Sequence, residues 1–326
     1  MSRYIIKRLL LMIPILLGIS FIVLILIDLA PGDVARKVAG VEAEDWEVEE
    51  VRAQLGLSDP LLVRYGRFIW NALHGTFGKS FINKKDVMKD MLMRWPYTIV
   101  LATLSVALAV VIGIPIGIFA ATNQYSWKDN TAIFLSLFCV SMPPFWFALL
   151  LVQFFSVKLG WLPAAGVESW KSWILPTVSL AVAYAAGIVR QMRSNMLEVI
   201  RQDYIVTARA KGLHEGKVLY RHALKNALIP VIQTVGGLYS MALGGALIAE
   251  TIFSLPGLGS YSLSALTNRD YPAIQGSVLF LSILHSAMIL IIDLVFAFVD
   301  PRIRSQYARS KKRIAKGVSS GEKAKA

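Results

Sequence analysis

Long apolar runs without charges dominate this chain, and shorter polar segments separate them. Six of these runs are long enough, or nearly so, to cross a hydrocarbon core, which takes about 20 apolar residues as a helix. Because lipid offers the backbone no hydrogen-bond partners, each run is expected to be helical. The candidate spans are residues 9–29, 97–121, 131–157, 174–190, 227–252 and 277–299. The pattern predicts an all-α integral membrane protein with six transmembrane helices, of which only the fourth is short.

The basic residues between the spans indicate which side of the membrane each segment faces, since short cytoplasmic segments carry an excess of Lys and Arg. The N-terminus and residues 122–130, 190–226 and 300–326 hold 21 of the 34 basic residues. The opposite side holds two in residues 158–173 and one in residues 253–276. The formal charge of +13 thus fits two cytoplasmic termini better than nucleic-acid binding, for which we find no motif.

The N-terminal apolar run could be a secretory signal peptide or a retained helix. Basic residues precede it, but Leu9–Leu29 is longer than a signal core and no small-residue cleavage site follows. The Ala30-Pro31-Gly32-Asp33 segment instead indicates a helix stop. We therefore expect a first transmembrane helix that stays in the protein.

A small folded cap is predicted outside the membrane, between the first and second spans. The acidic stretch Glu42–Glu50 precedes an amphipathic helix over Val51–Leu55, which ends near Gly56. Pro60 then restarts an apolar and basic pattern. The segment is therefore interpreted as folded structure and not as a flexible linker.

Composition divides the chain into three regions. Residues 1–96 hold the first helix and the external cap, and residues 97–304 hold the other five helices. Residues 305–326 form a basic tail that is predicted to be disordered in the cytoplasm. Within the five-helix core, the cytoplasmic loop 200–230 is the segment best suited to contact another protein.

Small residues recur every four positions on three of the spans. The stripes are Ala109, Gly113, Gly117 and Ala121 on the second, Ser179, Ala183 and Gly187 on the fourth, and Gly236, Ser240 and Gly244 on the fifth. Such stripes let helix backbones approach closely in lipid. Each could pack within this chain or against a second subunit, and the sequence leaves both alternatives open.

The third span is interrupted by Met142-Pro143-Pro144, because proline removes helix hydrogen bonds. Breaks of this kind in membrane helices often line a cavity. A simple kink is the alternative, and the sequence does not separate the two.

Few residues within the membrane could carry chemistry. The acids in or beside the spans are Asp28, Glu250 and Asp293, and they form no paired relay of the kind that proton pathways use. Structural hydrogen bonding is therefore the favoured role for them. This weakens the main alternative function, an ion- or proton-coupled secondary transporter.

No catalytic or metal site is predicted. The four histidines lack metal-ligand spacing, and the single cysteine, Cys139, excludes a disulfide within the chain. Gly78-Lys79-Ser80 resembles the end of a phosphate-binding loop, but Leu73 stands where that loop needs glycine. We expect a chain that is not an enzyme and binds no cofactor itself.

The cytoplasmic loop 200–230 is the most informative segment. Asp203 is expected to cap a short helix that continues through Lys211, and Gly212 is expected to end it in a left-handed conformation. Pro230 would then open the fifth span. A second helix between them would place three basic residues on one face: Lys217, Arg221 and Lys225.

This loop resembles the EAA loop of ABC importer permeases, in the form found in the B-type subunits of dipeptide, oligopeptide and nickel importers. Val206 and Thr207 stand where that motif has Glu-Ala, whereas Ala208 and Gly212 match it. In that family the short helix docks in a groove on the ATPase subunit. The residues to which this role carries over are Asp203, Tyr204, Thr207, Ala208, Arg209, Ala210, Lys211 and Gly212.

The resemblance extends over nearly the whole chain except the tail. Residues 3–33, with their Pro-Gly-Asp ending, and residues 55–81 resemble the family's N-terminal signatures, although Thr76 stands where Asp is usual. Residues 249–276 (AETIFSLPGLGSYSLSALTNRDYPAIQG) and 293–304 (DLVFAFVDPRIR) resemble its C-terminal signatures. Four motifs in the right order identify this branch of the permease family, but they say less about which solute is transported.

The resemblance implies a type I permease fold in a bacterial inner membrane, where the chain lies in the lipid bilayer with other subunits. The implied partners are a homologous second permease, two ABC ATPase subunits that hold ATP and Mg²⁺, and an extracytoplasmic solute-binding protein. The implied function is import of peptides or related small solutes. A non-transporting membrane scaffold is the remaining alternative.

Residues 249–272 are expected to form an external re-entrant gate, because proline and glycine break the helix there. The candidate pathway or gate residues are Met142, Pro143, Ser240, Glu250, Pro256, Gly257 and Gly259. On the cytoplasmic side, Gly212→Pro or a bulky residue at Ala208 is expected to uncouple transport and leave folding intact.

Overall fold

The computed structural model describes residues 2–40 and 42–299, so the predicted tail, residues 305–326, lies outside the described residues. Within that part of the chain the regular structure is helical, and the single β-type pairing is an isolated bridge between Lys79 and Asp86. Two π-helical segments, η1 and η3, and one 3-10 helix, η2, accompany the α-helices. In chain order the elements are α1 (Ser2–Leu29), α2 (Val34–Ala39), α3 (Asp45–Gln54), α4 (Leu61–Leu73), α5 (Val87–Thr122), α6 (Trp127–Ser141), α7 (Pro144–Leu151), η1 (Val152–Lys158), η2 (Trp170–Trp173), α8 (Ile174–Ile200), α9 (Asp203–Ala210), α10 (Glu215–Lys217), η3 (Val218–Ala223), α11 (Leu224–Gly245), α12 (Leu247–Ile252), α13 (Leu258–Asn268) and α14 (Tyr271–Val299).

Five helical stretches of the described chain are long and apolar enough to cross a membrane, and a sixth crossing arises if one bent pair counts as a span. The bent pair joins α6 to the stretch formed by α7 and η1, with 97° between the two parts. The prediction of an all-α membrane protein with six spans is therefore confirmed.

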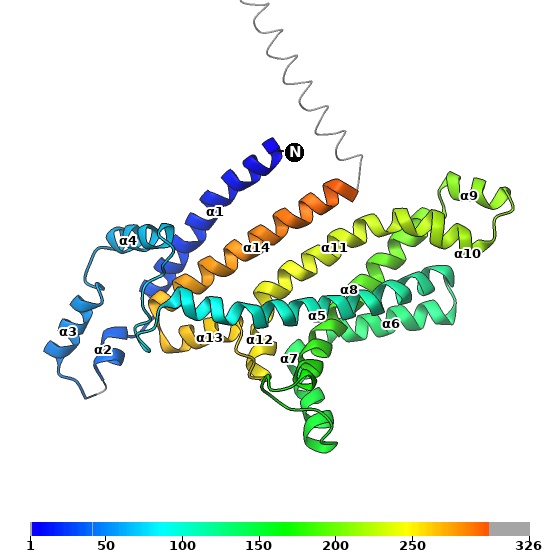
Figure 1. The fold of residues 1–326 in the computed structure, drawn as a ribbon. Helices are drawn as coiled ribbons and strands as arrows, with labels where there is room; N and C mark the ends of the chain where they lie inside the picture. Colours follow the sequence, from blue (N-terminus) through cyan, green and yellow to red (C-terminus); the bar gives the residue numbers. More distant parts are fainter. Residues whose placement is uncertain (1, 41, 300–326) are drawn as a thin grey trace, which may run out of the picture.

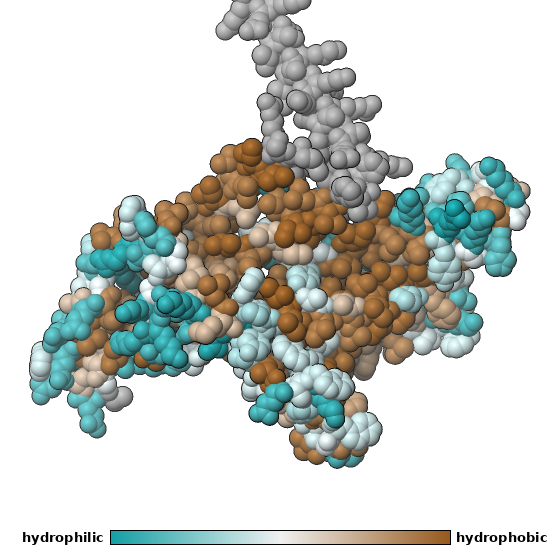
Figure 2. Space-filling model, viewed as in Figure 1, coloured by the Kyte–Doolittle hydropathy of each residue, from teal (hydrophilic) through white to brown (hydrophobic). Residues whose placement is uncertain are grey.

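The long helices form a hydrophobic body with polar structures at its two ends. Figure 1 shows α2 to α4 at one end and the loop of α9 and α10 at the other. In Figure 2 the surface between these ends is mostly hydrophobic, and the ends themselves are hydrophilic. The start of α1 and the end of α14 lie close together, which fits termini on the same side of the membrane (Figure 1).

The small residues of the second span pack within the chain, against α8. A Cβ atom added to Gly113 would lie 2.8 Å from the Cβ of Ile188, and one added to Gly117 would lie 2.6 Å from the Cβ of Met192. Real Cβ atoms do not approach this closely, so α5 needs glycine where α8 crosses it. Ile188 and Met192 are fully buried in this contact.

The stripes on the fourth and fifth spans contain some residues that pack within this chain and others that are open to a second subunit. Gly236 of α11 lies against α14, where an added Cβ would be 2.6 Å from Ile292 Cγ1. An added Cβ at Gly187 of α8 or Gly244 of α11 would have no atom of the described residues within 4 Å apart from its chain neighbours and the backbone of its own helix. Part of each stripe is thus used within the chain, and these two positions leave surface for another subunit.

The fourth span is longer than residues 174–190, the range predicted for it. Helix α8 continues to Ile200 because a charged residue beyond the predicted end has a partner. The Nε and Nη2 atoms of Arg193 donate to the two carboxylate oxygens of Asp129 on α6, each at 2.6 Å. Asp129 is almost fully buried, so this bidentate pair ties the ends of the two helices together.

The proline positions exclude a simple kink in the third span and correct the expectation for the fifth. At Met142 the chain is extended, with φ −74° and ψ 128°, and a bend of 97° there is far more than a simple kink. Pro230 does not open the fifth span, because it lies inside α11, which continues the helical stretch that begins at α10. Prolines are tolerated inside membrane helices where neighbouring groups satisfy the freed carbonyl.

The external helix α3 begins earlier than predicted. It covers Asp45–Gln54, so the acidic stretch is part of the helix and does not merely precede it. Glu44 and Glu47 explain this start, since each side chain is paired with the other residue's backbone N–H in a capping box. Helix α4 begins directly after Pro60, as expected.

The Pro-Gly-Asp segment both ends α1 and begins α2. Gly32 has a φ of +119°, which favours glycine, and the chain turns away from the membrane there. Asp33 Oδ1 then accepts a hydrogen bond from the Ala35 amide at 2.9 Å, which caps α2. The sequence predicts the end of α1 but does not indicate that α2 begins directly after it.

The cap is folded onto the membrane body. Phe68 of α4 and Phe77 lie with their rings stacked, 6.1 Å between centroids. Both belong to a buried cluster that includes Met91 of α5 and Leu258 of α13. This packing confirms that the segment is not a flexible linker.

Candidate functional site

Helix α9 begins and ends near the predicted positions, but the residue at its N-cap differs from the predicted one. Gln202 is the N-cap and makes no side-chain cap hydrogen bond, so the prediction that Asp203 caps the helix is wrong. Asp203 is the first helical residue, where its negative charge still favours the helix N-terminus. Lys211 ends the helix, and Gly212 follows with the left-handed φ of +73° that was predicted.

The two faces of α9 differ. Ile205 and Ala208 are buried, and they belong to the same hydrophobic cluster as Val218 and Ala223 of η3. The other face is exposed: Asp203, Tyr204, Val206, Thr207, Arg209, Ala210 and Lys211. Because Ala208 points inward, a bulky residue there would disturb the loop's own packing, contrary to the expectation that folding stays intact.

Two polar contacts fix the orientation of α9. Asn226 Nδ2 of α11 donates to the Tyr204 hydroxyl at 2.7 Å. Across the Gly212 turn, Arg209 Nη2 of α9 donates to Glu215 Oε1 of α10 at 2.6 Å. The hydrogen bond to Glu215 raises the pKa of Arg209 above its already high value, so the arginine stays charged at any physiological pH. Helix α9 therefore has an exposed face held in a defined position.

The segment after α9 differs in form from the prediction. The second helix consists of α10 and the π-helical η3, and it runs into α11 without a break. Its three basic residues are exposed: Lys217, Arg221 and Lys225. At its base, Asn195 Nδ2 of α8 donates to the Ala227 carbonyl at 3.3 Å. A force on this loop would thus act directly on α11 and α8.

On the external side, Glu250 of α12 lies at the centre of a buried hydrogen-bond cluster. Its side chain is 0% exposed. Oε1 accepts from the Thr98 hydroxyl of α5 at 2.7 Å, and Oε2 accepts from the Ser260 amide of α13 at 2.9 Å. The Thr98 oxygen in turn accepts from the Leu258 amide at 2.9 Å. This Glu250 cluster, Glu250 with Thr98 and the amides of Leu258 and Ser260, joins α12, α13 and α5.

Gly257, just before α13, and Gly259, the second residue of α13, are required by close approach and not by a left-handed backbone. A Cβ on Gly257 would lie 2.2 Å from Glu250 Cδ, and a Cβ on Gly259 would lie 2.6 Å from Leu247 Cα. Gly257 itself has an ordinary φ of −91°. Together with Pro256, these residues form a turn that seats the start of α13 directly on the carboxylate.

The structure does not bring all the predicted pathway residues together. Ser240 is buried against α14, where its hydroxyl lies 2.8 Å from His285 Nδ1. Met142 and Pro143 lie at the bend between α6 and α7. Glu250, Pro256, Gly257 and Gly259 alone share one place in the fold, the hairpin of α12 and α13.

The other membrane acids have arginine partners that the sequence reasoning missed. Arg64 Nη1 of α4 donates to Asp28 Oδ1 at 2.5 Å. Arg8 Nη2 of α1 lies 2.7 Å from Asp293 Oδ2 of α14. The second pair spans nearly the whole sequence, so no local pattern could reveal it. Both pairs join α1 to other elements, which supports a structural role for these acids.

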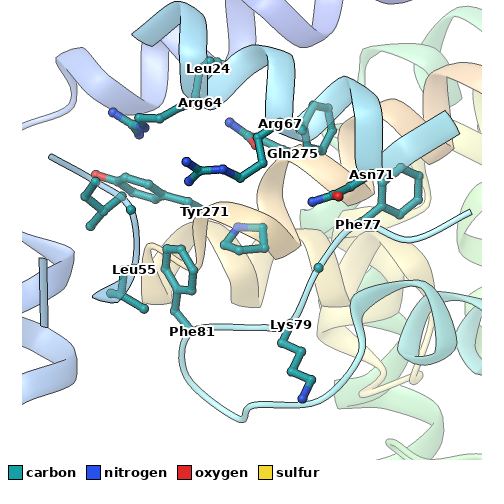
Figure 3. A pocket seen from close by; sticks show the side chains of 15 residues that line it. Leu24, Leu55, Arg64, Arg67, Asn71, Phe77, Lys79, Phe81, Tyr271 and Gln275 are labelled. Carbon is teal, nitrogen blue, oxygen red and sulfur yellow. The ribbon is translucent and has the colours of Figure 1, made fainter. Parts of the chain in front are cut away.

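An external pocket of about 200 Å³ is a feature that the sequence did not indicate. Figure 3 shows Arg64, Arg67 and Asn71 of α4 facing Tyr271 and Gln275 of α14 across it. Arg64 is paired with Asp28, and Arg67 Nη2 donates to Asp59 Oδ2 at 2.6 Å. Its two arginines are therefore already neutralised.

Within residues 2–40 and 42–299, no three or more His, Cys, Asp or Glu side chains come together in a way that could hold a metal ion. What the described chain does offer is an exposed helix at the cytoplasmic end and a buried, hydrogen-bonded hairpin at the external end.

Comparison with known proteins identifies the family. The model of the family described as "Binding-protein-dependent transport system inner membrane component" matches residues 113–305, and the model of its N-terminal part matches residues 1–102. The glutathione transport system permease protein GsiC of Salmonella paratyphi A is 40% identical over 304 residues, 93% of this chain and 99% of that protein. The GsiC protein of Escherichia coli (strain K12) is 39% identical over the same shares.

A solved structure shares the fold. A chain of the MetNI methionine ABC transporter, in an inward-facing conformation, matches with a TM-score of 0.58 and 19% identity, over 65% of this chain and 97% of that chain. At this identity the likeness shows the fold alone. The family match, the relatives and the apolar helices together show that this chain belongs to the binding-protein-dependent transport system inner membrane components, and is a multi-pass permease subunit of an ABC importer in the bacterial inner membrane.

Proposed function

We propose that this permease imports glutathione or similar short peptides, and that α9 is the element through which ATPase subunits drive it. The importer would contain this chain, a homologous second permease, two ATPases and an external binding protein. ATP and Mg²⁺ would be bound by the ATPases, because no nucleotide-binding loop is present in this sequence.

One observation carries the coupling role. Helix α9 has an apolar residue, Val206, that is 57% exposed at the cytoplasmic end of the molecule, although the buried residues beside it hold the helix in place. Aromatic residues are enriched at the centres of protein interfaces, and the exposed Val206 lies beside such a residue, Tyr204. The exposed Tyr204 extends this surface, and no glutamate at position 206 is needed for it.

A matched pair of substitutions tests this role. Val206→Asp places a charge in the proposed contact, and Val63→Asp makes the same change at a valine of α4 that is 51% exposed on the external side. In gentle detergent, we expect Val206→Asp to lose at least tenfold of the co-purified ATPase and Val63→Asp to keep it. Equal ATPase recovery from both variants would refute the proposal.

Motion of α9 would reach the gate through the long helices. Closure of the ATPases would move both α9 loops and rock the permease pair from inward-facing to outward-facing. A shift from mostly one state to mostly the other needs about 5 kcal/mol of differential binding. We expect Gly212→Pro to leave the spans folded and to lower ATP-driven uptake at least tenfold, because proline cannot adopt the φ of +73° found there.

The external hairpin of α12 and α13 is proposed as the gate. The Glu250 cluster attaches it to α5, so rotation of α5 would carry the hairpin with it. Cysteine pairs placed between α13 and the partner permease should cross-link in one nucleotide state and not in the other. Cross-linking that is the same with and without ATP would argue against gating.

The cargo is proposed from the relatives, since the two named above are permeases of glutathione transport systems. The whole importer in liposomes, with its binding protein, should accumulate radiolabelled glutathione or a dipeptide only when ATP is inside. Uptake driven by a proton gradient without ATP would instead favour a secondary transporter.

A further inference from the structure

An apolar groove lies at the external end of the helix pair α1 and α14. Its volume is about 430 Å³, and its walls include Val23 and Leu26 of α1, Leu266 of α13, and Ile274 and Val278 of α14. Leu26 is 61% exposed and Leu266 is 59% exposed. Helices α1 and α14 are the least buried of the candidate spans, so the groove opens where lipid would surround the chain.

The mouth of the groove holds a cation without an acidic partner. Arg269 lines the groove beside Ala30 and Pro31, and no ion pair joins it to any acid among residues 2–40 and 42–299. Its guanidinium lies over Gly32, where an added Cβ would be 1.1 Å from Nη1. Gly32 therefore provides the space in which this side chain sits.

A second cation, Lys37 of α2, contacts the end of α13 next to Arg269 in the chain. Lys37 Nζ contacts the Thr267 carbonyl at 3.4 Å and Asn268 Oδ1 at 3.3 Å, and it has no acidic partner in the described chain either. Both contacts are to the residues just before Arg269. The ammonium group keeps a donor for a further oxygen.

The acids closest to this mouth are engaged elsewhere. Asp28 is paired with Arg64, and Asp33 is paired with Arg52 Nη2 at 2.6 Å. Asp270 is buried and accepts hydrogen bonds from Ser80 and the Phe81 amide. Within the described chain, neither Arg269 nor Lys37 thus forms an ion pair with an acid.

The backbone at Arg269 is unusual for this residue type. It ends α13 with φ +58° and ψ +36°, a left-handed position at which glycine or asparagine is favoured. An arginine costs about 1 kcal/mol there. This left-handed backbone sets the direction in which the Arg269 side chain leaves the end of α13, over Gly32.

We propose that this groove binds one anionic phospholipid of the outer leaflet, with an acyl chain between α1 and α14 and the phosphate on Arg269 and Lys37. From Tyr271 to Val278 a helix rises about 10 Å, at 1.5 Å per residue, so the groove holds the upper part of an acyl chain. Arg269 lies beside Ala30 and Pro31, just past the external end of the span Ile5–Leu29, which is where the hydrocarbon core gives way to lipid headgroups. Arginine donates to phosphate oxygens in a bidentate way, which suits this ligand.

The purified importer, stripped of lipid in detergent and titrated with palmitoyl-oleoyl phosphatidylglycerol, tests the site by native mass spectrometry. We expect saturable binding of one lipid at this site, at least tenfold weaker in Arg269→Gly. Glycine suits the left-handed backbone, so this variant removes the charge without a folding penalty. Arg36→Gln, at an exposed arginine of α2, is the matched control and should bind as the wild type does.

Two further experiments test the apolar contact with the acyl chain separately from the contact with the phosphate. Leu26→Trp should fill the groove and weaken lipid binding at least tenfold, whereas glycerol 3-phosphate, which lacks acyl chains, should not bind measurably. Equal lipid binding by wild type and Arg269→Gly would overturn the proposal, and so would equal binding of glycerol 3-phosphate and the lipid.

A labelling experiment tests whether another subunit covers the groove. In a Cys139→Ala background, Leu26→Cys should react with a membrane-soluble maleimide in the assembled importer, and phosphatidylglycerol should slow that reaction. If the cysteine reacts in the isolated chain and is fully protected in the lipid-free importer, the partner permease occupies the groove, and the lipid proposal is wrong.

Discussion

The cytoplasmic loop around α9 and the external hairpin of α12 and α13 are both short helices joined by glycine turns, yet they are held in opposite ways. Helix α9 buries one narrow face and exposes the rest, and a Cβ added to Gly212 in its turn would meet nothing of the described chain within 4 Å. The hairpin buries a carboxylate and seats two glycines against it. The comparison teaches that α9 keeps most of its surface available for another protein, as the proposed coupling requires, whereas the hairpin is tied to α5 by buried hydrogen bonds.

The largest effect is expected from loss of the carboxylate at the centre of the hairpin. Glu250→Ala should lower the free energy of unfolding by about 3 kcal/mol, because it leaves the Thr98 hydroxyl and the Ser260 amide buried without an acceptor. Denaturant titration in detergent micelles measures this. Glu198→Ala, an exposed glutamate of α8, should change stability by less than about 0.5 kcal/mol, and equal losses in both variants would contradict the account.

A methyl group in the hairpin turn should have the next largest effect. Gly259→Ala would place its Cβ 2.6 Å from Leu247 Cα, a backbone atom that cannot turn aside. Overpacking of this kind costs about 2 kcal/mol. An unchanged unfolding midpoint for Gly259→Ala would show that α12 and α13 are not packed as described.

The matching glycine of the cytoplasmic loop should be more tolerant. Gly212→Ala meets no atom within 4 Å, so only the left-handed φ of +73° opposes it, at a cost of about 1 kcal/mol. Gly212→Asn should recover much of this, because asparagine tolerates that conformation. A loss for Gly212→Ala as large as that for Gly259→Ala would remove the distinction between the two turns.

The smallest effect is expected at the ion pair beside α9. Arg209 and Glu215 are both substantially exposed, so Arg209→Gln should lower the free energy of unfolding by about 0.5 kcal/mol or less. The same titration measures it, and the loss should shrink further in high salt. A loss above about 2 kcal/mol would mean that the pair is a main support of the loop.

Local patterns predicted the elements of this fold well. Uninterrupted apolar runs located the spans, Gly212 marked the end of α9, and the Pro-Gly-Asp segment marked the end of α1. These features depend on a few consecutive residues, whose backbone preferences and hydrophobicity act locally. Span ends were less predictable where a charged residue has a distant partner, as Arg193 has in Asp129.

The residues that fix the candidate sites could not be predicted, because their partners also lie far away in the sequence. The sequence marked Glu250 as a membrane acid but could not show that Thr98, far away in the chain, donates to it. Arg269 looked like an ordinary external arginine, because only the fold places it over Gly32 and beside α1. The inward direction of Ala208 depends on η3, whose π-helical form no local signal indicated.

Site-specific photocross-linking at α9 tests the central claim most directly. With benzoylphenylalanine in place of Val206, the assembled importer should give a covalent product with an ATPase subunit, and the same residue in place of Val63 should give none. An importer that hydrolyses ATP and transports cargo, yet yields no ATPase product from Val206 or from the neighbouring exposed Tyr204, would contradict the account.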